Sequence, residues 1–224
     1  MTRAKGFLAR GLVVACALGL WFWTQSLIGA RGSTASTLTD SIHLWTQTWN
    51  AALWNRPGLA DAVLMGSSLY IDAVGLFLLL GGLFGASFRP VLGLVALFFL
   101  RQMCQFVVAL PAPEGMLWRN PGFPSLFVTY GVSNDLFFSG HTALAVYGFT
   151  EIRRLKKPVL TWLSAGAALA EVAVVLVLRA HYFIDVFTGA LAALWVASWI
   201  HGAAAVLDRK LPGRRASPFQ GGHV

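Results

Sequence analysis

Six long apolar stretches limit what this chain can fold into. They lie at residues 11–30, 59–86, 90–110, 136–152, 158–178 and 183–207. A helix of about 20 residues, rising about 1.5 Å per residue, crosses a hydrocarbon core of about 30 Å. Charged residues make up only 12% of the chain, whereas a soluble domain carries about 25%. We therefore predict an all-α, polytopic membrane protein, a six-transmembrane-helix bundle that forms a single domain over residues 1–224.

The first apolar stretch follows a basic start at Arg3, Lys5 and Arg10, as the apolar part of a signal peptide would. Its bulky end at residues 21–23 (Trp-Phe-Trp) lacks a small-residue cleavage site. We therefore predict a retained helix. Residues 38–56 have apolar side chains at roughly helical spacing, and two alternatives stay open for them: an amphipathic helix on the membrane surface, or a plain loop.

The positions of Lys and Arg predict the orientation of the bundle. With the N-terminus inside, the inner segments hold 12 of the 17 basic residues and the outer segments hold four. Inner loops of membrane proteins carry such an excess, so both termini are expected in the cytoplasm. The same loops account for the net charge of +8, and nucleic-acid binding is not expected. Short termini and compact loops favour a bacterial plasma membrane.

Two polar motifs interrupt the apolar background. One, at residues 135–142, contains His141, and the other, at residues 179–185, contains His181. The 40 residues between the two histidines cross the membrane inward, turn, and cross back. Span counting therefore predicts both histidines at the same face, the outer one.

The second motif pairs a histidine with a carboxylate. His181 and Asp185 are spaced i, i+4, and they share a face if the sixth helix begins near Arg179. A carboxylate that accepts from one ring nitrogen leaves the other free to attack, and it stabilises the imidazolium that forms. His141 opposite would act as general acid and base. A surface ion pair and a structural histidine at a helix end are the ordinary alternatives.

Groups that bind phosphate accompany the histidines. Ser139, Gly140 and the first free N–H groups of the fourth helix form an anion site, although Ser-Gly before a helix is also a plain N-cap. Arg179 and Arg101 are positioned to neutralise phosphate charge.

At residues 135–142 and 181–186 the sequence resembles the lipid phosphatase and phosphotransferase superfamily called PAP2. More narrowly, it is similar to the sphingomyelin synthase branch and to plant phosphatidylcholine:diacylglycerol cholinephosphotransferases. A less specific third stretch covers residues 101–105 and 110–113. Together these stretches span roughly residues 101–190, under half of the chain.

The resemblance implies a catalytic triad of His141, His181 and Asp185, with a phosphohistidine intermediate on His181. It also implies a phospholipid donor, a lipid-alcohol acceptor such as diacylglycerol or ceramide, and neither a cofactor nor a metal. Asp135, Gln105 and Tyr182 become candidate site-lining residues, although the ordinary role of a carboxylate at Asp135 is to favour a helix N-terminus.

Departures from the phosphatase pattern favour head-group transfer. Phosphatases of the superfamily have a proline before Ser-Gly-His, where this chain has Phe138. They also have Ser-Arg ahead of the second histidine, where this chain has Val174 and Val175. Their first motif, a lysine and an Arg-Pro, is not matched at its spacing.

Three charges fall within the predicted spans: Asp72, Arg101 and Glu171. Charges at such depth are costly and are usually paired or functional. We considered two roles for Arg101, a structural ion pair with Asp72 or Glu171, and phosphate binding in a wet cavity. His43, His201 and His223 have no partner pattern and are expected at interfaces or in the tail.

The sequence therefore predicts a membrane enzyme that transfers phosphate-linked lipid head groups. A lipid phosphate phosphatase or phospholipase-C-like hydrolase is the alternative within the superfamily. A non-catalytic lipid transporter or scaffold is the alternative of another class, and it does not explain two aligned histidines. Head group, acceptor and oligomeric state stay open, because Gly-rich helix faces serve packing within a chain as well as between chains.

Overall fold

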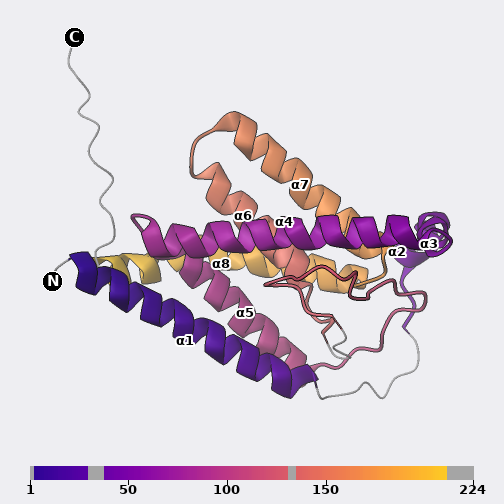
Figure 1. Cartoon of the computed structure of the whole chain (residues 1–224), viewed down its shortest axis with the longest axis horizontal. Helices are drawn as coiled ribbons and strands as arrows, with labels where there is room; N and C mark the ends of the chain where they lie inside the picture. Colours follow the sequence, from indigo (N-terminus) through magenta and orange to yellow (C-terminus); the bar gives the residue numbers. More distant parts are fainter. Residues whose placement is uncertain (1–2, 30–37, 131–134, 211–224) are drawn as a thin grey trace, which may run out of the picture.

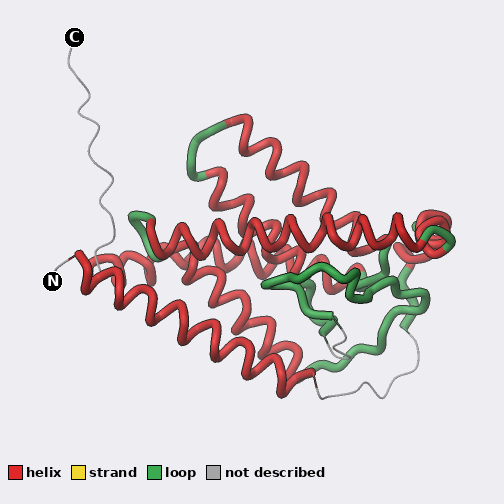
Figure 2. Tube along the Cα trace, viewed as in Figure 1, coloured by secondary structure: helices red, strands yellow, loops and turns green. Residues whose placement is uncertain are grey.

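The computed structural model describes residues 3–29, 38–130 and 135–210, and within these ranges it is helical with no strand. A bundle is formed by α1 (Arg3–Gly29), α4 (Pro57–Phe84), α5 (Arg89–Val107), α6 (Gly140–Arg153), α7 (Pro158–Val177) and α8 (Phe183–Lys210) (Figure 1). The short helices α2 (Ser41–Trp45) and α3 (Gln47–Trp54) lie at the end where α4 begins. The longest loop segments gather at that same end (Figure 2), which we call the loop end.

Five of the described helices are long and apolar enough to cross a membrane, namely α1, α4, α5, α7 and α8. The all-α prediction is confirmed for the described residues, and the five apolar helices are consistent with an integral membrane protein. The count of six spans is not confirmed. The expected fourth span corresponds to α6, which has 14 residues and a length of about 21 Å. It begins at Gly140 rather than at residue 136, because the Ser139 hydroxyl accepts from the Thr142 N–H and caps the helix there.

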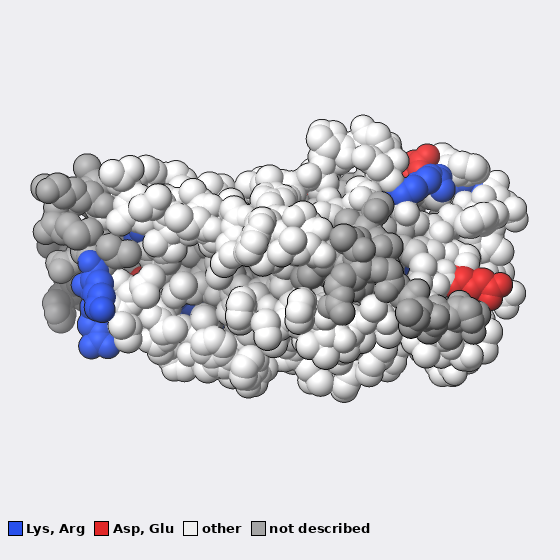
Figure 3. Space-filling model, turned by 90° about the horizontal axis from the view of Figure 1, so that it is seen from below, with Lys and Arg blue, Asp and Glu red and all other residues white. Residues whose placement is uncertain are grey.

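The surface of the molecule fits an apolar environment. Figure 3 shows Lys, Arg, Asp and Glu side chains toward the two ends of the visible face, with other residues along the middle. Large apolar side chains are exposed on the long helices, among them Leu8, Val107 and Trp162. Such a surface is typical of an integral membrane protein.

The end opposite the loop end is closed by buried arginines. The start of α1 and the end of α8 lie together there (Figure 1). Arg10 donates to the carbonyls of Gly82 and Gly85, and its Nη2 lies 3.8 Å from Asp208 Oδ1. Arg89 forms a buried ion pair with Glu151. Arg89 also donates from Nη2 to the Ala197 carbonyl of α8 at 3.1 Å. Together these contacts join α1, α4, α5, α6 and α8.

The predicted ion pair of Arg101 with Asp72 or Glu171 is wrong. Asp72 accepts from the Ser125 hydroxyl and from the N–H groups of Leu126 and Phe127, at 2.9–3.0 Å. Glu171 accepts from the Ser67 hydroxyl at 2.6 Å. Both carboxylates are therefore satisfied by hydrogen-bond donors, one set of which lies in a loop that folds back into the bundle.

Residues 38–56, left open as amphipathic helix or loop, form α2 and α3.

We predict that Gly93→Ala destabilises the bundle. A Cβ on Gly93 would clash with the Tyr147 Oη, and this hydroxyl donates to the Arg89 carbonyl at 2.9 Å. Relieving such a clash costs about 1 to 3 kcal/mol, so the midpoint of thermal unfolding in detergent should fall. The matched control is Gly166→Ala in α7, which has open space around it and should hold or raise the midpoint. Equal midpoints for the two variants would contradict the close packing of α5 on α6.

Candidate active site

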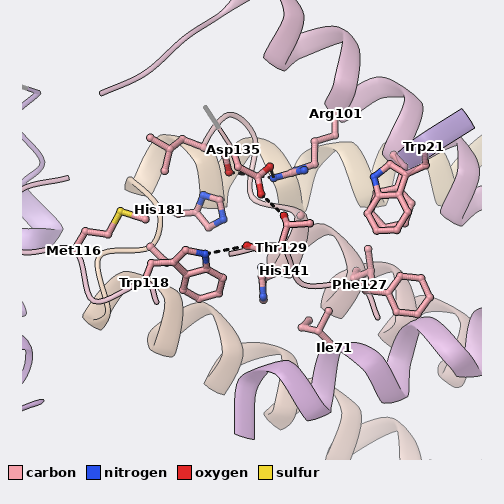
Figure 4. Close-up of a pocket in the computed structure, with 15 residues that line it drawn as sticks. Trp21, Ile71, Arg101, Met116, Trp118, Phe127, Thr129, Asp135, His141 and His181 are labelled. Atoms are coloured by element: carbon pink, nitrogen blue, oxygen red, sulfur yellow. Dashed lines mark hydrogen bonds and ion pairs between the residues drawn. The ribbon is translucent and has the colours of Figure 1, made fainter. Parts of the chain in front are cut away.

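A small pocket at the loop end holds the residues of both polar motifs (Figure 4). Its volume is about 40 Å³, and its lining includes Arg101, Asp135, Gly140, His141 and His181. That volume accommodates about one or two water molecules. The rest of the lining is largely apolar and aromatic.

The two histidines meet because the starts of α6 and α8 are joined. The Ser139 N–H donates to the Asp185 carbonyl at 3.0 Å. Close approach is possible because Gly189 of α8 has no side chain, since a Cβ there would lie 2.6 Å from the Ser139 carbonyl oxygen. The rings of His141 and His181 consequently lie 6.3 Å apart, centroid to centroid. The prediction that both histidines return to the same end of the bundle is confirmed.

His181 lies next to the carboxylate of Asp185. The distance from His181 Nδ1 to Asp185 Oδ2 is 3.7 Å, too long for a hydrogen bond. The helix α8 begins at Phe183 rather than near Arg179, so the pair is not held on a helical face. Instead, Asp185 is the third residue of the helix, and its Oδ2 accepts from the Tyr182 N–H at 2.9 Å.

Three polar atoms of the predicted triad lack hydrogen-bond partners within the described part of the chain. They are Nε2 of His141, Nδ1 of His181 and Oδ1 of Asp185. All three side chains are at least nine-tenths buried. Buried polar atoms are normally hydrogen-bonded, and exceptions are common at functional sites. His181 Nδ1 lies 3.7 Å from the Asp185 carboxylate, so a small shift of the His181 ring would bring the two groups within hydrogen-bond distance.

Trp118 positions His141, and sequence reasoning missed this contact. The Trp118 indole meets the His141 ring edge to face, with centroids 5.1 Å apart. The indole N–H donates to the Thr129 carbonyl at 3.2 Å, which fixes the ring in the loop (Figure 4). The signal in the sequence was only an aromatic residue in a loop, with no spacing to tie it to a histidine.

Asp135 is the centre of the polar network beside the histidines. Its carboxylate forms an ion pair with Arg101 and accepts from Thr129 at 2.7 Å, Gln105 at 2.8 Å and Gln25 at 3.2 Å. Burial alone would raise the pKa of Asp135, but Arg101 and the hydrogen bonds from Thr129 and Gln105 outweigh it. The pKa of this carboxyl therefore lies below its ordinary value.

Arg101 is brought to the pocket by this network. Its Nε donates to the Phe138 carbonyl at 2.9 Å, and its Nη2 donates to Asp135. Neither bond uses Nη1. The guanidinium lines the pocket beside Gly140, which places a positive charge at the start of α6.

Two other predicted site residues lie near the histidines but do not line the pocket. Arg179 donates to the carbonyls of Glu114 and His43. The Tyr182 hydroxyl donates to the Pro111 carbonyl at 3.1 Å. Both side chains hold loops beside the pocket in this structure, and a role for either in phosphate binding stays a prediction.

His43, expected to have no partner, contacts the second motif. It is buried, and its Nε2 lies 3.0 Å from the His181 carbonyl oxygen. Its ring packs on Tyr182, 5.5 Å between centroids. The helix that carries it, α2, is capped by Asp40, whose carboxylate also accepts from the Phe183 N–H at 2.6 Å. Residues 40–43 therefore support the start of α8.

The family model AtPDCT1/2 matches residues 39–202. The match includes α2 through most of α8 and both histidine motifs, and it leaves α1 outside. No curated protein and no solved structure matches the chain. Within residues 3–29, 38–130 and 135–210, no group of three or more His, Cys, Asp or Glu side chains is placed to hold a metal ion.

We predict that Asp135→Asn destabilises the protein in a pH-dependent way. Asparagine leaves Arg101 buried without its counter-charge, which costs about 3 to 5 kcal/mol. Because the folded-state pKa of Asp135 is lowered, its stabilising effect is complete above about pH 4 and is lost as pH falls through the folded-state pKa. The gap between wild-type and variant unfolding midpoints should therefore shrink as pH falls from 7 to 3.

Asp61→Asn serves as the control for this measurement. Asp61 pairs with Arg119 at 2.7 Å, but both side chains are substantially exposed, so the loss should be small at every pH. A gap for Asp135→Asn that stayed constant from pH 7 to pH 3 would contradict the network.

Proposed function

The chain belongs to the phosphatidylcholine:diacylglycerol cholinephosphotransferase family, and we propose on this premise that it moves a phospho-head group between lipids through His141, His181 and Asp185. Family membership indicates a choline phosphotransferase of lipid metabolism, acting on phospholipid and diacylglycerol in membranes. The likeness to sphingomyelin synthases and to the wider PAP2 superfamily rests on the two histidine motifs.

The observation that carries the proposal is the pair of facing histidines. The two ring centroids lie 6.3 Å apart, and we expect a phosphorus centre bound in the pocket to be reached from both rings. One ring has a carboxylate beside it and the other does not. This asymmetry supports different roles, a nucleophile at His181 and a general acid and base at His141.

In the proposed first step, His181 attacks the phosphorus of the donor phospholipid. Since Asp185 lies on the Nδ1 side of the ring, Nε2 is the attacking atom. The bond between Nε2 and phosphorus forms as the bond from phosphorus to the diacylglycerol oxygen breaks. His141, which takes up a proton when the anionic phosphate of the donor binds beside it, gives that proton to the diacylglycerol oxygen. Asp185 stabilises the positive charge on the His181 ring.

In the second step a lipid alcohol takes the head group. Its hydroxyl oxygen attacks phosphorus while the bond to His181 Nε2 breaks, and neutral His141 accepts the hydroxyl proton. His141 ends protonated, ready for the next turnover. Each step moves one proton through His141, so a single residue serves as acid and then as base.

Charge on the transferring phosphate is balanced by groups at the start of α6. Arg101 lines the pocket with Nη1 outside its bonds to Asp135 and Phe138. Gly140, the first residue of α6, also lines it, and helix N-termini favour anions. Ser139 acts here as the N-cap, with its hydroxyl turned to the Thr142 N–H.

We predict that His181→Ala abolishes transfer. Purified protein in phosphatidylcholine liposomes with labelled diacylglycerol should produce labelled phosphatidylcholine, read by mass spectrometry. Loss of a triad nucleophile lowers turnover by about 10⁴-fold or more. The matched control is His201→Ala, an exposed histidine of α8 that does not line the pocket, which should keep wild-type turnover. Full turnover of well-folded His181→Ala would refute the assignment.

A second variant separates the two histidines. With a donor that has an acidic leaving group, such as p-nitrophenyl phosphocholine, the first step needs no proton from His141. We expect His141→Ala to accumulate phosphocholine on His181, detected on the corresponding peptide by mass spectrometry. No adduct under these conditions, or an adduct on another residue, would contradict the roles of nucleophile at His181 and acid and base at His141. In the liposome assay of the wild-type protein, release of free phosphocholine without formation of labelled phosphatidylcholine would make the protein a hydrolase.

A further inference from the structure

A long apolar groove runs between α1 and α5 beside the catalytic pocket. Its volume is about 350 Å³, and its lining comes from these two helices and Leu79 of α4. Ligand sites commonly measure about 300 to 1,000 Å³, so the groove is large enough for a ligand chain. No Asp, Glu, Lys or Arg is found among the described residues that line it.

The groove and the catalytic pocket share a wall one side chain thick. Trp21 of α1 and Phe98 of α5 line both cavities. Their rings stack with centroids 4.5 Å apart and planes at 19°. Figure 4 shows Trp21 on the pocket side next to Arg101. A molecule seated in the groove therefore ends against the wall of the site where phosphate is transferred.

Two polar atoms at this wall have no partner within the described residues. They are the acceptor Oε1 of Gln102 and the donor Nε1 of Trp21. Both side chains line the groove, and they are only 7% and 6% exposed. The hydroxyl of Thr24, the other polar residue of the lining, is satisfied by the carbonyls of Leu20 and Trp21. Buried polar atoms are normally hydrogen-bonded. Because both residues line the groove, a ligand there that supplies a donor and an acceptor is the partner that we expect for them.

We infer that this groove binds the acceptor diacylglycerol, with an acyl chain between α1 and α5 and the glycerol end at Gln102 and Trp21. The inference rests on the function proposed above. Diacylglycerol is uncharged, its one hydroxyl matches the free acceptor, and its ester carbonyls match the free donor. Phosphatidylcholine fits poorly, because it has no hydrogen-bond donor and its phosphate would enter a lining without a cation.

The assignment gives α1 a role in acceptor selection. This helix lies outside the residues matched by the family model, yet it supplies one side of the groove and Trp21 of the shared wall. It also supplies Gln25, which donates to Asp135 at 3.2 Å. Acceptor binding and the catalytic network therefore meet on one turn of α1.

The kinetic test uses a substitution on α1 that places a large side chain in the groove. Ala17 lines the groove but not the catalytic pocket, and we expect Ala17→Trp to raise the KM for diacylglycerol by about tenfold. The KM for phosphatidylcholine and the rate of phosphocholine transfer to His181 should stay as in the wild type. The matched control is Ala15→Trp, which adds the same ring two residues away on the exposed side of α1 and should change neither KM. An unchanged KM for diacylglycerol in folded Ala17→Trp would overturn the inference.

A binding test stands apart from turnover. Diacylglycerol carrying a diazirine in one acyl chain is photolysed with the His181→Ala variant, and labelled peptides are identified by mass spectrometry. We expect labels on α1 and α5, removed by excess diacylglycerol but not by excess phosphatidylcholine. Labels confined to other helices, or competition by phosphatidylcholine, would overturn the inference. His181→Ala lacks the proposed nucleophile, so the labelling result does not depend on the catalytic mechanism. The mechanism is tested separately, because it is refuted if His181→Ala retains transfer.

Discussion

A carboxylate buried in an apolar bundle costs several kcal/mol unless charged and hydrogen-bonding groups surround it. The Asp135 side chain is only 15% exposed. Its partners come from three parts of the chain: Gln25 of α1, Arg101 and Gln105 of α5, and Thr129 of the loop before α6. Satisfying one charge therefore fixes where α1, α5 and the loop meet. Arg101, held by the same bonds, places its positive charge at the pocket that we propose to be catalytic.

The joined starts of α6 and α8 place the two histidines of the candidate site next to each other. A helix N-terminus leaves N–H groups without intrahelical partners. Here the Ser139 hydroxyl accepts from the Thr142 N–H of α6, and the Asp185 carboxylate accepts from the Tyr182 N–H just before α8. The Ser139 N–H links the two helices by donating to the Asp185 carbonyl. The same two positions lie two residues before His141 and four residues after His181. Capping and catalytic geometry are thus set by the same short segments, and a change to either cap should move a histidine.

The sequence was enough to predict the helical membrane fold and the meeting of the histidines, because both follow from apolar length and span counting. It was not enough to find the partner of Arg101. Asp72, one of the two carboxylates considered for this role, accepts instead from a loop that folds back into the bundle, and the position of that loop depends on three-dimensional packing. His43 was missed for a similar reason, because its contact with the His181 carbonyl joins residues 138 positions apart. The 14-residue length of α6 depends on where Ser139 caps it, which apolar content alone does not reveal.

The size and lining of the catalytic pocket bear on the choice between transfer and hydrolysis. The phosphohistidine that we propose would be consumed by whichever hydroxyl reached it first, and bulk water is far more abundant than any lipid alcohol. A pocket of about 40 Å³ walled by rings such as Trp21, Phe98 and Phe127 admits few water molecules. An apolar groove on the other side of the Trp21 and Phe98 wall would supply a lipid hydroxyl at high local concentration. Exclusion of water and local supply of acceptor together favour transfer, with no need for a residue that selects against water directly.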